Sequence, residues 1–114
     1  MNILQFEDII SWQKAKELTF KIYNIFGESN DFAFRGQIER ASVSIMNNIA
    51  EGFERKTNNE FKQFLYVAKG SSGEVRSMLH IAKELNIISD KDFDYLYQLS
   101  TEISKLLSGL IKTL

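Results

Sequence analysis

The sequence predicts an all-α protein, an up-down-up-down antiparallel four-helix bundle that forms a single domain over residues 1–114. Three observations predict this fold class. Apolar residues recur at steps of three and four along four stretches, and no stretch keeps the two-residue period of a strand. The chain contains no proline, which favours long uninterrupted helices. The connections between the stretches are about four to six residues long, which is typical of neighbouring helices that run in opposite directions.

The first helix is predicted over residues 8–26. Its apolar face consists of residues spaced three and four apart: Trp12, Ala15, Leu18, Thr19, Ile22, Tyr23 and Phe26. Gly27 follows directly and is expected to end the helix in a left-handed conformation. The polar residues after Gly27 are typical of a turn.

The second helix is predicted over residues 32–55. One apolar stripe is expected to face the core: Phe34, Ile38, Ala41, Ile45 and Ile49. Met46, Ala50 and Phe53 extend the apolar surface beyond what one bundle seam requires. We therefore expect the chain to associate with itself through this second surface.

The third helix is predicted to begin at a capping box, in which Thr57 accepts from the amide of Glu60 and Glu60 reaches back to the amide of Thr57. A heptad seam then runs without interruption: Phe61, Leu65, Ala68, Ser72, Val75, Leu79 and Ala82. Gly70 and Gly73 each cost roughly 1 kcal/mol relative to alanine in a helix, so we expect a neighbouring element to pack very close to them. Asn86 is predicted to end this helix.

The fourth helix is predicted to begin at Ser89, whose hydroxyl can cap the helix. Asp90 and Asp92 suit its positive end. Its apolar stripe consists of six residues: Leu96, Ser100, Ile103, Leu107, Leu110 and Leu114. With this helix the pattern accounts for the whole chain.

The composition excludes several kinds of site. Without cysteine the chain has no disulfide, no thiolate nucleophile and no Cys-based zinc site. A single histidine, His80, cannot assemble a di-iron site of paired E-x-x-H motifs, and we expect it to be a surface or interface residue. The glycine cluster within residues 69–73 lies in the heptad helix, so its amides are expected to make helix hydrogen bonds rather than hold a phosphate. We therefore predict no enzyme, no cofactor and no metal.

The hydropathy pattern bears on location. No apolar run approaches the ~20 residues of a membrane-spanning helix. The first residues also lack the basic region of a secretion signal. We therefore expect a cytoplasmic protein without membrane contacts.

Charge is distributed unevenly along a chain whose net charge is −1. Residues 35–83 carry eight basic and five acidic residues, whereas the segments on either side each carry three basic and five acidic residues. Four cations of the third helix lie seven residues apart: Lys62, Lys69, Arg76 and Lys83. They would form a line roughly 31 Å long, which could bind a phosphate backbone or another acidic surface, with Arg40 and Arg55 nearby. The alternative is that these cations only keep the seam soluble.

A polar stripe follows the second helix beside its apolar residues. Its members share a narrow angular band: Gln37, Arg40, Ser44, Asn48, Glu51 and Arg55. We expect an interhelical hydrogen-bond ladder that fixes the register of the bundle. A binding site is the alternative.

Residues 37–52 read QIERASVSIMNNIAEG and resemble the "QIRRAAVSIPSNIAEG" signature of the 23S rRNA intervening-sequence protein family. Further matches are WQKA at residues 12–15, EF and FL within residues 60–65, and AKGSSGEV at residues 68–75. The resemblance extends over nearly the whole chain, with Met46 where proline is common.

The resemblance implies a left-handed antiparallel four-helix bundle that assembles into a homopentameric barrel with a central channel. Accessory variability proteins of diversity-generating retroelements are similar, and there a basic pentamer engages a reverse transcriptase and nucleic acid. By this resemblance Ser44, Asn48, Glu51 and Gly52 are register and interface residues. The charge pattern and the resemblance together predict a non-catalytic oligomeric module that binds nucleic acid, RNA before DNA. The alternative is a scaffold for a partner enzyme, such as a reverse transcriptase.

Overall fold

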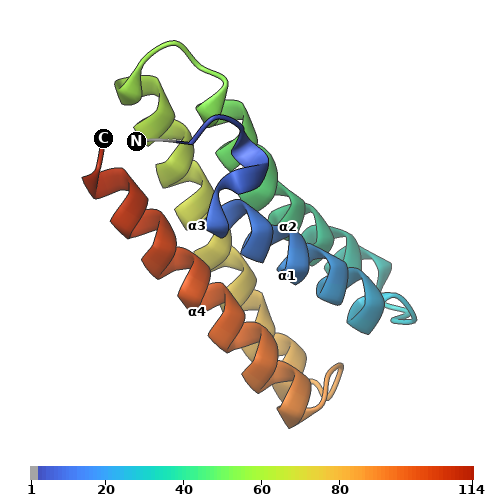
Figure 1. Cartoon of the computed structure of the whole chain (residues 1–114). Helices are drawn as coiled ribbons and strands as arrows, with labels where there is room; N and C mark the ends of the chain where they lie inside the picture. The colour runs from blue at the N-terminus through green and yellow to red at the C-terminus, as the bar shows by residue number, and fades with distance from the viewer. Residues whose placement is uncertain (1–2) are drawn as a thin grey trace.

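The structure is a computed structural model that describes residues 3–114. In this part of the chain a short 3-10 turn precedes four α-helices, and there is no β-strand. The elements are η1 (Phe6–Asp8), α1 (Ile10–Phe26), α2 (Phe32–Phe53), α3 (Asn58–Glu84) and α4 (Asp90–Lys112). Figure 1 shows the helices packed lengthwise as a bundle. The prediction of an all-α protein with four helices is confirmed.

Each helix packs against two others. The pairs in contact are α1 with α2, α2 with α3, α3 with α4, and α4 with α1, so α2 and α4 occupy opposite corners of the described bundle. Residues of α2 and α3 pair in opposite order along the two helices. Gln37 bonds to Glu74, and Ser44, which comes later in α2, bonds to Ser71, which comes earlier in α3. Because α3 contacts both α2 and α4, one of its flanks faces α2 and another faces α4.

The core consists of the predicted seams. All seven seam residues of α3 are buried, and so are the first four of the predicted α4 stripe. The prediction for α1 contains one error, because Tyr23 is 46% exposed while Ser11 is buried. Tyr23 follows the fully buried Ile22 by one residue, and that step of about 100° carries its side chain out of the core-facing arc.

The predicted N-caps of α3 and α4 are present. Thr57 Oγ1 accepts a hydrogen bond from the Glu60 amide at 3.1 Å, and Ser89 Oγ accepts one from the Asp92 amide at 3.0 Å. The Glu60 carboxylate differs from the prediction, because it accepts from the Thr57 hydroxyl at 3.2 Å rather than from the Thr57 amide. Its other oxygen lies 3.4 Å from Arg55 Nε, so the capping carboxylate also ties the end of α2 to the start of α3.

The two predicted C-terminal signals have different outcomes. Asn86 has a φ of 57°, and the Ile87 amide donates to the Ala82 carbonyl at 2.8 Å, so the predicted stop of α3 is confirmed. Gly27 has a right-handed conformation, with φ −59° and ψ −25°, so the left-handed prediction is wrong. Glycine suits this position for lack of space, because a Cβ would lie 2.7 Å from the Tyr23 carbonyl oxygen.

The prediction of close packing at Gly70 and Gly73 is wrong within the described chain. A Cβ at Gly70 would meet nothing within 4 Å, and one at Gly73 would meet only the Arg76 guanidinium at 3.8 Å. Both glycines lie on the outer side of α3, away from its seam. The close approach is at Gly52 of α2, where a Cβ would come within 2.6 Å of Phe64 Cβ.

Candidate nucleic-acid interface

A groove of about 650 Å³ lies between α3 and α4. We call it the α3–α4 groove, and its lining residues are Lys69, Arg76, Tyr97, Thr101, Ser104, Lys105, Ser108, Gly109 and Lys112. Four of these residues are cations, and none is a carboxylate. Three of the cations are exposed at the rim, whereas Arg76 is half-buried. The groove therefore concentrates positive charge in a chain that is nearly neutral overall.

Hydroxyl groups hold Arg76 in place. Its NH1 nitrogen donates to Ser72 Oγ at 3.0 Å, to the Ser100 carbonyl at 3.1 Å and to Ser104 Oγ at 2.8 Å. Ser72 and Ser100 are fully buried and are also bonded to each other at 2.8 Å. Within residues 3–114, the Nε and NH2 nitrogens of Arg76 have no hydrogen-bond partner. One side of the guanidinium is thus anchored, while two nitrogens with three N–H groups remain available.

The cations of the groove are not neutralised by the ion pairs of residues 3–114. The three ion pairs within residues 3–114 are Lys14–Glu102, Arg35–Glu39 and Arg55–Glu60. None of them involves a cation of the α3–α4 groove. Each groove cation therefore keeps its charge available to an anion.

The four cations predicted to form a line on α3 have different surroundings. Because α3 is continuous, all four side chains stay on one flank, and Lys69 and Arg76 enter the groove. Lys83 lies at the far end, with its Nζ 4.6 Å from the centroid of the Phe93 ring. Lys62 is half-buried at the other end and does not line the groove.

The structure does not bring Arg40 and Arg55 to this groove. Arg40 lies on α2 and Arg55 in the turn after it, whereas the groove lies where α3 meets α4. Arg55 is paired with Glu60, and its guanidinium lies 4.9 Å from the centroid of the Phe64 ring. Arg40 folds back along its own helix, since its NH1 would be 3.1 Å from a Cβ placed at Gly36.

Lys105, Lys112 and Tyr97 line the groove and were absent from the residues that the sequence singled out. They belong to the fourth helix, and they reach the cations of the third helix only because the two helices pack side by side. A signal was present, because Lys105 and Lys112 are also seven residues apart. Ser72 of α3 bonds to Ser100 of α4, and in helices that run in opposite directions this pairing places Lys105 near the level of Lys69 and Lys112 toward the start of α3.

Three rings lie beside the groove on the same flank of α3. We call them the aromatic cluster: His80 from α3, and Phe93 and Tyr97 from α4. Each pair of ring centroids is 5.3 Å apart. His80 is exposed and Tyr97 is half-buried, whereas Phe93 is buried. His80 is thus a surface residue in contact with aromatic rings.

The polar stripe of α2 supplies hydrogen bonds toward α3. Ser44 Oγ lies 2.9 Å from Ser71 Oγ, and Asn48 Nδ2 donates to the Ser44 carbonyl at 2.8 Å. Gln37 Nε2 donates to Glu74 at 3.3 Å. The Ser44 and Gln37 contacts couple specific positions of α2 and α3, whereas the bond from Asn48 lies within α2. Glu51, by contrast, is exposed and makes no hydrogen bond through its side chain within the described residues.

The family model described as 23S rRNA-intervening sequence protein matches residues 7–109. The chain belongs to this family. Its fold is similar to the crystal structure of a protein of unknown function from the S23 ribosomal protein family of Bacteroides thetaiotaomicron. The two are 27% identical with a TM-score of 0.86, and the match covers 90% of this chain and 99% of that chain. None of the curated proteins matches the chain. The resemblance inferred from residues 37–52 is confirmed.

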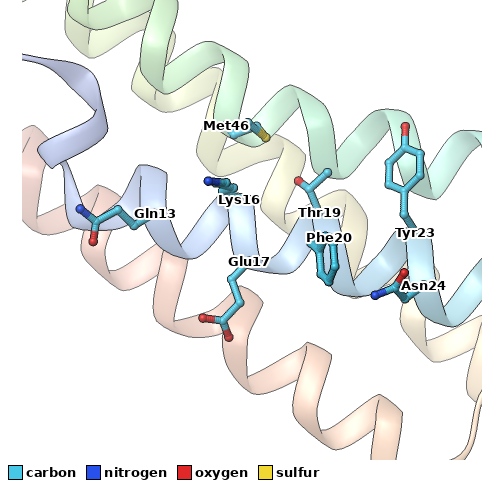
Figure 2. Close-up of a pocket in the computed structure, with 8 residues that line it drawn as sticks. All are labelled: Gln13, Lys16, Glu17, Thr19, Phe20, Tyr23, Asn24 and Met46. Atoms are coloured by element: carbon cyan, nitrogen blue, oxygen red, sulfur yellow. The ribbon is translucent and has the colours of Figure 1, made fainter.

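A second groove, mainly apolar, lies along α1. Seven residues of α1 and Met46 of α2 line its volume of about 630 Å³. Phe20 and Tyr23, two of the α1 residues, are 65% and 46% exposed. Figure 2 shows Met46 reaching from α2 toward the α1 residues Lys16 and Thr19. We call this the α1–α2 groove.

The other two residues of the predicted self-association surface differ in their surroundings. Phe53 packs partly against the core, and its ring centroid lies 6.0 Å from that of Phe61. Ala50 is half-buried. Met46 also packs partly against the core. The apolar surface of α2 is therefore smaller than its sequence indicates, and α1 supplies the larger exposed side chains.

Titratable side chains elsewhere do not gather into a metal site, since no group of three or more His, Cys, Asp or Glu within residues 3–114 could hold an ion. Tyr95 donates a hydrogen bond to Glu17 at 2.7 Å, and this bond raises the pKa of Tyr95 above its ordinary value of 10.0. The pair joins α4 to α1, away from the α3–α4 groove. Over the same residues, no helix combines the length and apolar character needed to cross a bilayer.

Proposed function

We propose that this protein is a non-catalytic homo-oligomer that binds nucleic acid, with RNA as the first candidate, in the α3–α4 groove. The observation that carries the proposal is the lining of that groove, which has four cations and no carboxylate. Cations that neutralise phosphates release condensed counterions, and this release supplies most of the affinity in non-specific nucleic-acid binding. A net charge of −1 does not oppose binding when the cations are concentrated on one face.

The spacing of the cations supports the same proposal. Lys69 and Arg76 are seven residues apart on α3, and Lys105 and Lys112 are seven apart on α4, which corresponds to about 10 Å in each helix. A phosphate chain lying in the groove would therefore meet positive charge from both sides. Arg76 adds two free nitrogens in a fixed position at the floor.

The proposed assembly is a ring of five left-handed, up-down-up-down antiparallel bundles. The opposite order of contacts along α2 and α3 supports the antiparallel arrangement within each bundle. The exposed apolar side chains of Phe20 and Tyr23, beside Met46, support an interface between copies, because such a surface gains stability when it is covered. The mass of the particle, measured by light scattering, tests this part of the proposal, and a monomer would contradict it.

The binding test compares two triple variants that remove the same charge. In the groove variant Lys69, Lys105 and Lys112 become glutamine, and all three are exposed, so the core is unaffected. The control replaces three exposed cations that line neither the α3–α4 groove nor the apolar groove of α1: Arg40→Gln, Lys56→Gln and Lys91→Gln. Filter binding of a labelled RNA is measured for each protein at several salt concentrations.

We expect wild type and control to lose affinity steeply with salt and the groove variant to bind weakly. For a single-stranded RNA, three lost phosphate contacts should reduce the slope of log affinity against log salt by about 2. Equal affinities and slopes for the two variants would contradict the proposal.

The apolar α1–α2 groove favours one alternative function, a scaffold that presents its helices to a partner enzyme. In that case the lysines of the α3–α4 groove would meet an acidic protein surface instead of phosphates. Affinity purification from the native cells, with and without nuclease, separates the two functions. A partner that stays bound after nuclease treatment, together with no RNA binding by the pure protein, would favour the scaffold.

A further inference from the structure

The aromatic cluster extends the α3–α4 groove in the direction of Lys83. Tyr97 lines the groove itself, beside Arg76, and His80 lies one helical turn beyond Arg76 on α3. The Tyr97 and His80 rings are 5.3 Å apart and nearly perpendicular, at 72°. Aromatic rings next to a row of cations are the combination on which single-stranded nucleic acids bind, with bases on the rings and phosphates on the cations.

We propose that the α3–α4 groove binds a single-stranded polynucleotide in preference to a duplex, with separate bases stacked on the rings of Tyr97 and His80. This inference rests on the proposed nucleic-acid binding and specifies the form of the ligand. Stacking tolerates any base, because every base has a π-face, so little sequence preference is expected. From Lys69 to Lys83 the groove and the cluster extend over about 21 Å of helix, which suits a strand of a few nucleotides.

The difference in burial between the residues of the groove favours a single strand. Arg76 and Tyr97 are half-buried, whereas Lys69 and Lys105 are exposed at the rim. A duplex is wide and presents paired bases in its interior, so its phosphates would reach the rim lysines but its bases would not reach Tyr97. A single strand can enter the groove with its bases unpaired and can occupy the rim and the floor together.

The anchoring of Arg76 supports the same inference. Ser72, Ser100 and Ser104 hold one nitrogen of its guanidinium, so the side chain is already ordered before a ligand arrives. A flexible side chain loses conformational entropy on binding, and an ordered one loses less. Arg76 can therefore fix one phosphate at the floor, next to the ring on which the neighbouring base would stack.

The test measures fluorescence anisotropy with one labelled oligonucleotide of mixed sequence, as single-stranded RNA, as single-stranded DNA, and annealed to its complement. Wild type is compared with Tyr97→Leu and with His80→Leu, which remove a ring from the cluster. His80 is exposed, so His80→Leu leaves the core intact if Tyr97→Leu should lower stability. The matched control is Tyr66→Leu, which removes a 55% exposed ring of α3 that does not line the groove.

We expect wild type to bind both single strands more tightly than the duplex. Tyr97→Leu should weaken single-strand binding about tenfold or more, and His80→Leu should weaken it in the same direction. Tyr66→Leu should leave it unchanged, and Tyr97→Phe should retain most of it. Duplex binding equal to or tighter than single-strand binding, or wild-type affinity in both Tyr97→Leu and His80→Leu, would overturn the inference.

The two proposals fail in different ways. If no form of the oligonucleotide binds, or if the triple lysine variant binds as well as wild type, the proposed function itself is wrong. If the lysines matter but the rings do not, nucleic-acid binding stands and only the preference for single strands is wrong.

Discussion

Gly52 packs tightly against α3, and replacing it with alanine tests the packing of the bundle. The added Cβ would lie 2.6 Å from Phe64 Cβ, 2.9 Å from Phe61 Cδ1 and 3.3 Å from the Phe61 carbonyl oxygen. The backbone carbonyl and the Cβ cannot swing aside, so α2 and α3 must move apart. Overpacking of this kind costs about 1–3 kcal/mol, and the better helix propensity of alanine offsets about 1 kcal/mol. We expect Gly52→Ala to lower the free energy of unfolding by up to about 2 kcal/mol.

The matched control is Gly70→Ala, the same substitution on an open helix surface. A Cβ there meets nothing within 4 Å, so only the propensity gain remains and the variant should be more stable by about 1 kcal/mol. Both variants are compared by urea denaturation followed by circular dichroism, at one protein concentration, because the proposed self-association would make the measured stability depend on concentration. Equal effects of the two substitutions would refute the packing argument. Destabilisation by Gly70→Ala alone would indicate that another copy of the chain covers α3.

Three further substitutions test single contacts. Thr57→Ala removes the N-cap of α3 and should lower the free energy of unfolding by about 1 kcal/mol in denaturant titrations. Ser72→Ala removes a buried hydroxyl that bonds to Ser100, Ser104 and Arg76, so the free energy of unfolding should fall by about 1–2 kcal/mol, whereas a neutral result would show that the serine network adds nothing. The bond to Glu17 raises the pKa of Tyr95, so its contribution to stability is present below the pKa of the unfolded chain, about 10, and is lost as pH rises through the folded pKa. Stability measured against pH should lose this alkaline decline in Tyr95→Phe.

The helices and their caps could be predicted because their causes are local. The seam of α3 follows from the spacing of apolar residues, and Thr57, Ser89 and Asn86 act through bonds to residues no more than a few positions away. Such contacts are the same whatever the rest of the chain does. The helix bounds in the structure therefore lie within two residues of the predicted ones.

The glycines show where sequence reasoning fails. A glycine in a helix indicates that a side chain is absent, but it does not indicate whether another element occupies the space. Gly52 lies against α3 while Gly70 lies open, and this difference depends on which side of each helix faces its neighbour. Gly27 is similar, since a nearby carbonyl rather than a left-handed φ explains it.

The groove could not be predicted from one helix alone. The sequence indicated Lys69 and Arg76, but the groove also needs Lys105, Lys112 and Tyr97 of α4. These residues come close to Lys69 and Arg76 only because α3 pairs with α4 and because the Arg76 side chain turns inward toward buried serines. If α3 and α4 are placed side by side in opposite directions, the charges of both helices together predict Lys105 and Lys112 as groove residues.

The serine contacts along the middle of α3 have a consequence for the order of folding. Residues 68–73 combine two glycines with two serines, and these residue types form isolated helices poorly. Ser71 bonds to Ser44 of α2, while Ser72 bonds to Ser100 of α4. The centre of the longest helix thus owes its stability to side chains from two other helices. We infer that the middle of α3 becomes fully helical only after α2 and α4 have docked on it. This short segment therefore folds late, although it lies at the middle of the chain.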